Sequence, residues 1–119
     1  MKAILIDPNK QVIMDVVIDK KNGLQDYYDH MECDTFAVPH YLENEDALYV
    51  DDEGLLKQGQ QYFKLDGWIY PVAGPALIVG TNVNTGDSVN AKTKVEDLEG
   101  KVEWWTAQDA YIYSKMNNL

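Results

Sequence analysis

The sequence predicts one α+β domain in which a mixed or antiparallel sheet packs against one main helix. Short β-branched runs separated by turn residues predict the strands, beginning with residues 2–6 and 12–18 on either side of a turn at 7–10. Apolar residues recur at i, i+4 and i+7 in residues 24–33 and predict the helix. At 119 residues the chain has the usual size of a single domain, 1–119.

The remaining elements follow in order along the chain. A third strand is expected at Thr35–Val38, ended by Pro39, and a fourth at Ala47–Val50. Asp66–Gly67 is a hairpin-turn dipeptide between Tyr62–Leu65 and the aromatic residues 68–70. The strongest buried-strand pattern ends the segment 71–80. A helical turn is expected at 95–99, followed by an aromatic tail over 102–113.

Charge narrows the classes of function. The net charge is −10, and all ten basic residues are lysine. Proteins that grip phosphates usually present a basic face rich in arginine, so direct nucleic-acid binding is not expected. The anionic field favours a basic partner or serves solubility. A lone cysteine and the lack of a long apolar stretch predict a soluble protein of a reducing compartment, the cytoplasm, that does not enter a membrane.

Three segments together resemble a known family. They are Lys2–Pro8, Ala47–Lys57 and Val72–Thr81. This order is similar to a small domain-of-unknown-function family carried by phages, prophages and plasmids, and the resemblance covers residues 1–82. It implies a mobile-element context near host-takeover genes and supplies no catalytic residues. In size and charge the chain is also similar in general character to anti-CRISPR proteins.

Catalytic motifs are missing from the sequence. It contains no phosphate-binding loop and no G-x-G-x-x-G, and neither Ser88 nor Ser114 lies in a nucleophile elbow. With twenty acids in the chain, carboxylate pairs arise by chance and identify no acid–base dyad. We therefore expect a protein that binds rather than an enzyme, with no catalytic residues. Gly74–Pro75 and Gly80 are expected to serve the backbone.

Asp26, His30 and Cys33 form a candidate metal site. At i, i+4 and i+7 they would share one helix face, and carboxylate, imidazole and thiolate are zinc ligands. Asp29 or Asp34 could replace Asp26. The alternative is a solvated helix face with an incidental cysteine, so zinc is the one cofactor that the sequence suggests.

The acidic run from residue 43 to 53 is the candidate partner-binding surface. Its carboxylates could imitate the phosphates of a nucleic acid and occupy a basic groove, with a tail tryptophan as an apolar anchor. The alternative is a solvated rim that protects a strand edge. The residues of this predicted surface are Glu43, Glu45, Asp46, Asp51, Asp52, Glu53, Trp104 and Trp105.

The leading hypothesis is a phage or mobile-element inhibitor. It would bind a host defence protein that handles nucleic acids, for which the CRISPR effector Cas9 is the named candidate, and block nucleic-acid loading in the host cytoplasm. The alternative is a domain that sequesters a small molecule or nucleotide, for which the tail aromatics could stack on a neutral ring.

Overall fold

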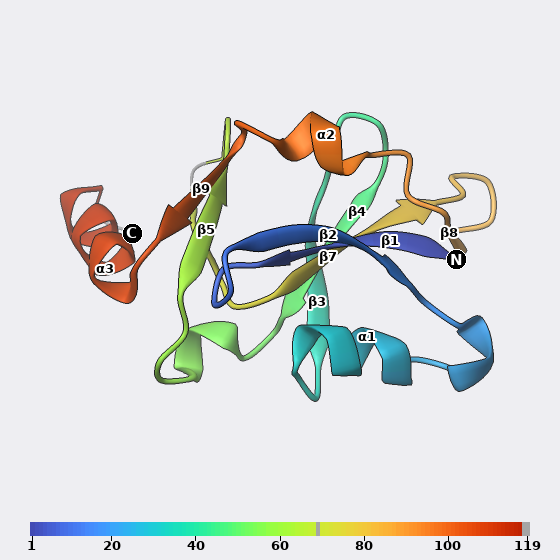
Figure 1. Ribbon diagram of the computed structural model, residues 1–119, viewed down its shortest axis with the longest axis horizontal. Helices are drawn as coiled ribbons and strands as arrows, with labels where there is room; N and C mark the ends of the chain where they lie inside the picture. Colours follow the sequence, from blue (N-terminus) through green and yellow to red (C-terminus); the bar gives the residue numbers. More distant parts are fainter. Residues whose placement is uncertain (69, 118–119) are drawn as a thin grey trace.

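The larger sheet forms the centre of the molecule. A computed structural model describes residues 1–68 and 70–117. Within these residues neighbouring strands pair antiparallel in the order β2-β1-β7-β4-β3, with β8 beside β7 (Figure 1). This confirms the predicted α+β class. The bounds are β1 Lys2–Asp7, β2 Val12–Val17, β3 Phe36–Tyr41, β4 Ala47–Asp51, β7 Ala76–Thr81 and β8 Ser88–Val89.

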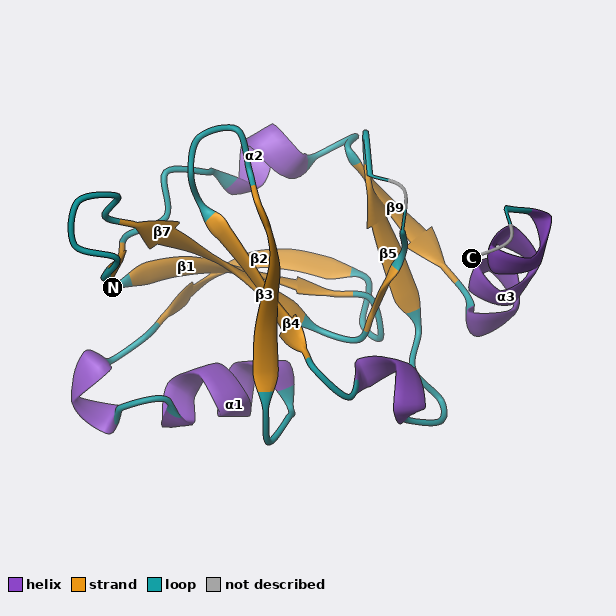
Figure 2. Ribbon diagram, turned by 180° about the vertical axis from the view of Figure 1, so that it is seen from behind, coloured by secondary structure: helices purple, strands orange, loops and turns teal. Residues whose placement is uncertain are grey.

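A second sheet and the helices cover the two faces of the larger sheet. The second sheet has the order β6-β5-β9, with β5 at Tyr62–Leu65, β6 at Val72–Ala73 and β9 at Val102–Trp105. Helix α1 (Gln25–Met31) lies on one face, and the second sheet and α2 (Val95–Leu98) lie on the other (Figures 1 and 2). Helix α3 (Ala107–Met116) follows β9 at the far end of the molecule, and the short 3₁₀ turns η1 and η2 cover Lys20–Asn22 and Gly54–Leu56.

The side-chain alternation of β1 divides the core into two clusters. Ala3 and Leu5 pack toward α1, whereas Ile4 and Ile6 pack toward the second sheet. Strand β7 is buried on both faces, so residues 76–79 form the continuous apolar run that the sequence displays. Gly80 ends this run where a Cβ atom would lie 2.1 Å from the carbonyl oxygen of Asn90. The close approach of the neighbouring backbone, rather than a turn after the strand, accounts for the glycine at this position.

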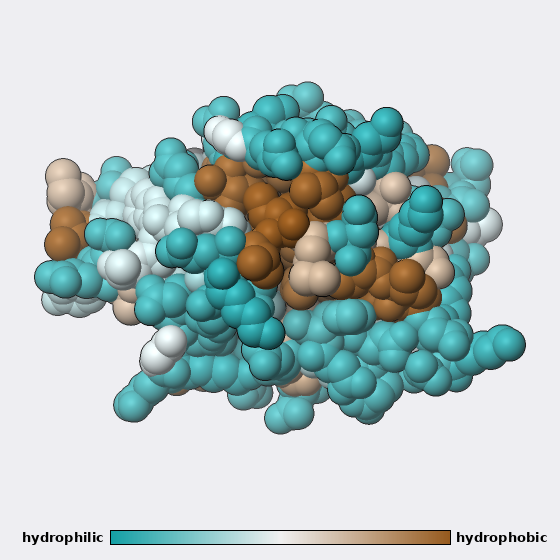
Figure 3. Space-filling view, viewed as in Figure 1, coloured by the Kyte–Doolittle hydropathy of each residue, from teal (hydrophilic) through white to brown (hydrophobic). Residues whose placement is uncertain are grey.

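The two edges of the larger sheet differ. Edge strand β3 continues through Pro39 to Tyr41, with a register shift between Ala37 and His40. The prediction that Pro39 ends this strand is wrong because an edge position does not need the missing N–H. At the other edge, β2 exposes Val12, Met14 and Val17, and Figure 3 shows apolar surface over β2 between the hydrophilic surfaces of α1 and α2.

One helix ends earlier than the sequence predicts, and another helix was not predicted. Helix α1 ends at Met31 because Glu32 adopts the left-handed conformation, with φ of 53°. Helix α3 was not predicted, although Thr106 and Asp109 cap its first turn reciprocally. Asp66–Gly67 forms the predicted turn, since the Trp68 N–H donates to the Leu65 carbonyl at 3.0 Å, and the strand that returns antiparallel to β5 is β6, further along the chain; Ile69 lies outside the described residues. No helix in residues 1–68 and 70–117 is long and apolar enough to cross a membrane.

Candidate functional site

Strand β4 divides the predicted acidic surface into two groups. Glu43 and Glu45 are exposed in the β3–β4 turn, and Asp52 and Glu53 are exposed after the other end of β4. The five residues of the strand separate the groups by roughly 17 Å at ~3.4 Å per residue. Figure 1 shows the first group's turn beside α2, whereas the chain after β4 runs toward the side of α1. The six acids therefore do not form one continuous track.

Asp46 belongs to the core rather than to the predicted partner-binding surface. It is fully buried at the start of β4. Its carboxylate accepts hydrogen bonds from the backbone N–H of Lys92 at 2.9 Å, from the backbone N–H of Thr93 at 2.7 Å and from the Thr93 hydroxyl at 2.7 Å. These bonds hold the segment before α2 against β4. The role predicted for Asp46 was wrong because no partner can reach this carboxylate.

Asp51 is also buried and already paired. Its Oδ1 accepts a hydrogen bond from the Glu53 N–H at 2.9 Å, and its Oδ2 lies 2.6 Å from the Lys57 ammonium. The hydrogen bond to Asp51 raises the pKa of Lys57. Because the Asp51 side chain is almost wholly covered, it is unavailable to a partner, which corrects its predicted role.

A new group of acids gathers where α1 and β4 end, and we call it the acidic end. Two contacts bring these segments together: the Asp52 N–H donates to the Thr35 carbonyl at 3.2 Å, and the Lys57 ammonium donates to the Glu32 carbonyl at 3.0 Å. All members of the acidic end are exposed. They are Asp29, Glu32, Asp34, Asp52 and Glu53.

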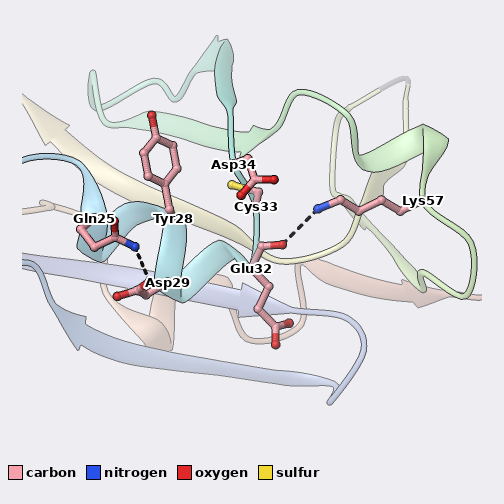
Figure 4. Close-up of a pocket in the computed structure, with 7 residues that line it drawn as sticks. All are labelled: Gln25, Tyr28, Asp29, Glu32, Cys33, Asp34 and Lys57. Carbon is pink, nitrogen blue, oxygen red and sulfur yellow. Dashed lines mark hydrogen bonds between the residues drawn. The ribbon is translucent and has the colours of Figure 1, made fainter.

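Three members of the acidic end, Asp29, Glu32 and Asp34, line a shallow hollow of about 530 Å³ (Figure 4). Asp52 and Glu53 follow β4 beside it, where the Asp52 N–H bonds to Thr35. Its walls come from α1 and the loop that follows, with Lys57 reaching in from the opposite side. Lys57 is the basic residue among those that line the hollow, and its charge is compensated by Asp51. The remaining carboxylates give this concavity a negative potential that suits a lysine or arginine side chain of a partner.

An apolar groove adjoins the acidic end across η2. One hollow of about 300 Å³ and another of about 590 Å³ share Leu55, Tyr70 and Pro71. Helix α3 lines the second hollow with Tyr111 and Ala110. Leu55 is 73% exposed, Tyr70 55% and Tyr111 63%, so large apolar side chains lie open to solvent beside the acids. We call the surface of Leu55, Tyr62, Tyr70, Pro71, Ala110 and Tyr111 the apolar groove.

The two tail tryptophans are half-buried and point in different directions, as adjacent strand residues must. Trp104 packs against the core cluster beneath the second sheet. Trp105 donates its indole N–H to Glu103 at 3.0 Å, and its ring meets Tyr113 of α3 edge-on at 5.0 Å. Both side chains therefore already have partners within the chain.

The predicted metal ligands do not converge. Asp26 accepts hydrogen bonds from the Asp19 N–H and the Asn22 side chain, whereas His30 lies 3.3 Å from the Val17 carbonyl. Cys33 is buried in the core cluster beneath α1, and burial raises the pKa of its thiol. The prediction of one exposed face was wrong for Cys33 because the left-handed Glu32 turns the chain inward.

Within residues 1–68 and 70–117, no three His, Cys, Asp or Glu side chains are placed to hold a metal ion together.

Sequence reasoning missed several members of the site. Glu32, Leu55, Tyr70 and Tyr111 carry no motif, and the contact between the ends of α1 and β4 is long-range. The sequence held one clue to this surface: Leu55 and Leu56 directly follow the polar turn 51–54. Two exposed leucines in such a turn are unusual and can indicate an interaction site.

Comparison with known proteins identifies the family and no function. No curated protein and no solved structure matches the sequence significantly. One family model, described as Domain of unknown function (DUF3846), matches residues 1–103. The match includes the acidic end and every residue of the apolar groove except Ala110 and Tyr111. Helix α3 follows the matched region. The chain is a member of the DUF3846 family.

Proposed function

We propose that this protein acts by binding a basic partner protein through its acidic end, rather than by catalysis. The observation that supports this most directly is the cluster of exposed carboxylates around a hollow whose one lysine is already paired. Association through such a surface gains from electrostatic steering and weakens as salt screens the charges.

The partner in this proposal is a host defence protein that handles nucleic acids, and the protein is a phage or mobile-element inhibitor that acts in the host cytoplasm. A nucleic-acid groove must be basic, because it binds phosphates. The carboxylates of the acidic end would occupy that groove and block loading of the nucleic acid. Cas9 is the first target to test, because its nucleic-acid channel is positively charged.

A gel shift of target DNA by a purified Cas9–guide complex tests the proposal. Prior addition of this protein should remove the shifted band at low salt and lose that effect as salt rises. The double variant Asp52→Lys/Glu53→Lys should no longer inhibit. Glu43→Lys/Glu45→Lys is the matched control, since it makes the same change of charge at the other end of β4 and should still inhibit.

Two outcomes would count against the proposal. An unaltered gel shift with the wild-type protein would remove Cas9 as the target. Equal loss of inhibition in both double variants would show that total charge, and not the acidic end, is responsible.

The alternative is a domain that sequesters a small aromatic ligand such as a nucleoside. One observation favours it: the 300 Å³ hollow is lined by Trp68, Tyr70 and His40, and the His40 and Trp68 rings lie 4.9 Å apart. This volume is at the lower limit of ligand pockets. Calorimetry with adenosine and with cytidine tests it, and binding that survives high salt and Glu53→Lys would favour this alternative, because Glu53 does not line this hollow.

A further inference from the structure

We infer that the apolar groove receives the apolar side chains of the same partner segment whose lysine or arginine side chains pair with the acidic end. This inference rests on the proposed function, because it takes the partner to be basic. It adds the chemistry of the partner's docking segment, which would be amphipathic, with apolar anchors next to basic residues.

Leu55 links the apolar groove to the acidic end. Leu55 follows the acidic end by two residues and lines both hollows of the groove. Lys57, at the other end of η2, lines the acidic hollow. A segment that crosses η2 would therefore meet carboxylates on one side and apolar side chains on the other.

Large side chains of the apolar groove are exposed to solvent. Leu55, Tyr70 and Tyr111 are each more than half exposed, and Leu56 beside them is 82% exposed. Isolated apolar residues at a surface are ordinary, but aromatic and aliphatic side chains around a shared hollow are typical of a protein interface. Tyrosine adds a large contact area at a low cost in conformational entropy.

The negative charge beside the apolar groove favours a basic occupant. The acidic end bears carboxylates beside the groove, and the whole chain has a net charge of −10. A second copy would bring two such surfaces together and be repelled, whereas a basic segment would be attracted. The occupant is therefore a segment of a basic partner protein.

Two synthetic peptides of equal length and charge test the inference. One consists of leucine and lysine, and the other of serine and lysine. Burial of one or two leucine side chains is worth roughly 1.5 kcal/mol or more, so the leucine peptide should bind about tenfold more tightly than the serine peptide. Fluorescence anisotropy measures both affinities.

Substitutions in the apolar groove test whether the leucine peptide binds there. Leu55→Ser/Tyr111→Ser should remove the advantage of the leucine peptide and leave the affinity for the serine peptide unchanged. Val83→Ser is the control, because Val83 is 64% exposed in a loop outside the groove. Both altered groove residues are exposed, so the variant should remain folded, which circular dichroism would check.

The outcomes separate this inference from the proposed function. Equal affinities of the two peptides for the wild-type protein, or an advantage that survives Leu55→Ser/Tyr111→Ser, would overturn the groove inference while a basic partner could still bind. Sedimentation that detects a dimer lost in this variant would assign the groove to a second copy and overturn the inference too. A leucine advantage combined with an unaltered Cas9 gel shift would support the groove and reject only that target.

Discussion

The two ends of β4 use the same residue type in opposite ways. At the start of the strand, Asp46 is buried and holds the segment 92–93 through hydrogen bonds to its carboxylate. Beyond its end, Asp52 and Glu53 are exposed and contribute to the acidic end, while Asp51 is buried against Lys57. A run of acids in the sequence can thus combine structural and surface roles, and burial separates the two.

The largest loss of stability is expected from a substitution at Asp46, at the start of β4. Asp46→Ala removes the acceptor for two backbone N–H groups and one hydroxyl, and the buried Thr93 N–H would be left without a partner. We expect a loss of about 3 kcal/mol in the free energy of unfolding, measured by urea denaturation. Glu43→Ala is the control and should change it by less than ~0.5 kcal/mol. A loss of similar size in both variants would contradict the division of roles.

A smaller loss is expected from Lys57→Met, which leaves the Asp51 carboxylate buried without its cation. Because Lys57 is partly exposed and solvent screens its charge, we expect about 1–2 kcal/mol in the free energy of unfolding. Asp51→Asn/Lys57→Met should restore part of it, since no buried charge remains. If the single variant is as stable as the wild type, Asp51 does not need its partner.

The same pair has a defined dependence on pH. The pKa of Lys57 is raised above its ordinary value of 10.5 by the hydrogen bond to Asp51. A raised pKa in the folded state contributes stability that is fully present below pH 10.5 and is lost as pH rises through the folded pKa. The difference in stability between wild type and Lys57→Met should therefore be constant from neutral pH to about pH 10 and decrease above it. A difference that already falls between pH 7 and 9 would contradict this assignment.

Cys33 reports on local opening near the acidic end. The thiol is buried, and burial raises its pKa, so little of it is thiolate near neutral pH. Alkylation by iodoacetamide should be at least about tenfold slower in the folded protein than in urea. Lys57→Met should accelerate it more than Glu43→Ala does. Rapid alkylation of the folded wild-type protein would show that Cys33 is accessible.

The smallest change in stability is expected from Asp52→Lys/Glu53→Lys. Both side chains are exposed, so the free energy of unfolding should change by less than ~0.5 kcal/mol. A thermal melt alongside the gel shift measures this. A clear loss of stability would mean that loss of inhibition in this variant reports unfolding, and single substitutions would then be required.

Local patterns predicted much of the fold. The β-branched runs that became β1, β2, β4 and β7 were visible because a strand must alternate or, when buried on both faces, be apolar throughout. Helix α1 was found from one apolar stripe. Helix α3 was missed because its apolar residues are largely exposed and Ala110 is its buried residue, so no clear stripe marks it.

The candidate site was less predictable than the fold. Asp52 and Glu53 were identified from the acidic run, and their exposure agrees with that prediction. Asp46 and Asp51 could not be distinguished from them, because the donors that satisfy them include Thr93 and Lys57, and Thr93 lies 47 residues away. Cys33 was placed on the wrong surface because a single left-handed residue, Glu32, decides where α1 ends.

The sequence by itself determined the charge, the α+β class and membership of the family, because composition and short-range periodicity record these properties. Tertiary structure decided which acids are buried and which gather at the acidic end, and it placed the apolar groove beside them. The physical reason is that burial and the pairing of distant donors with acceptors depend on contacts between segments far apart in the chain, which no local pattern encodes.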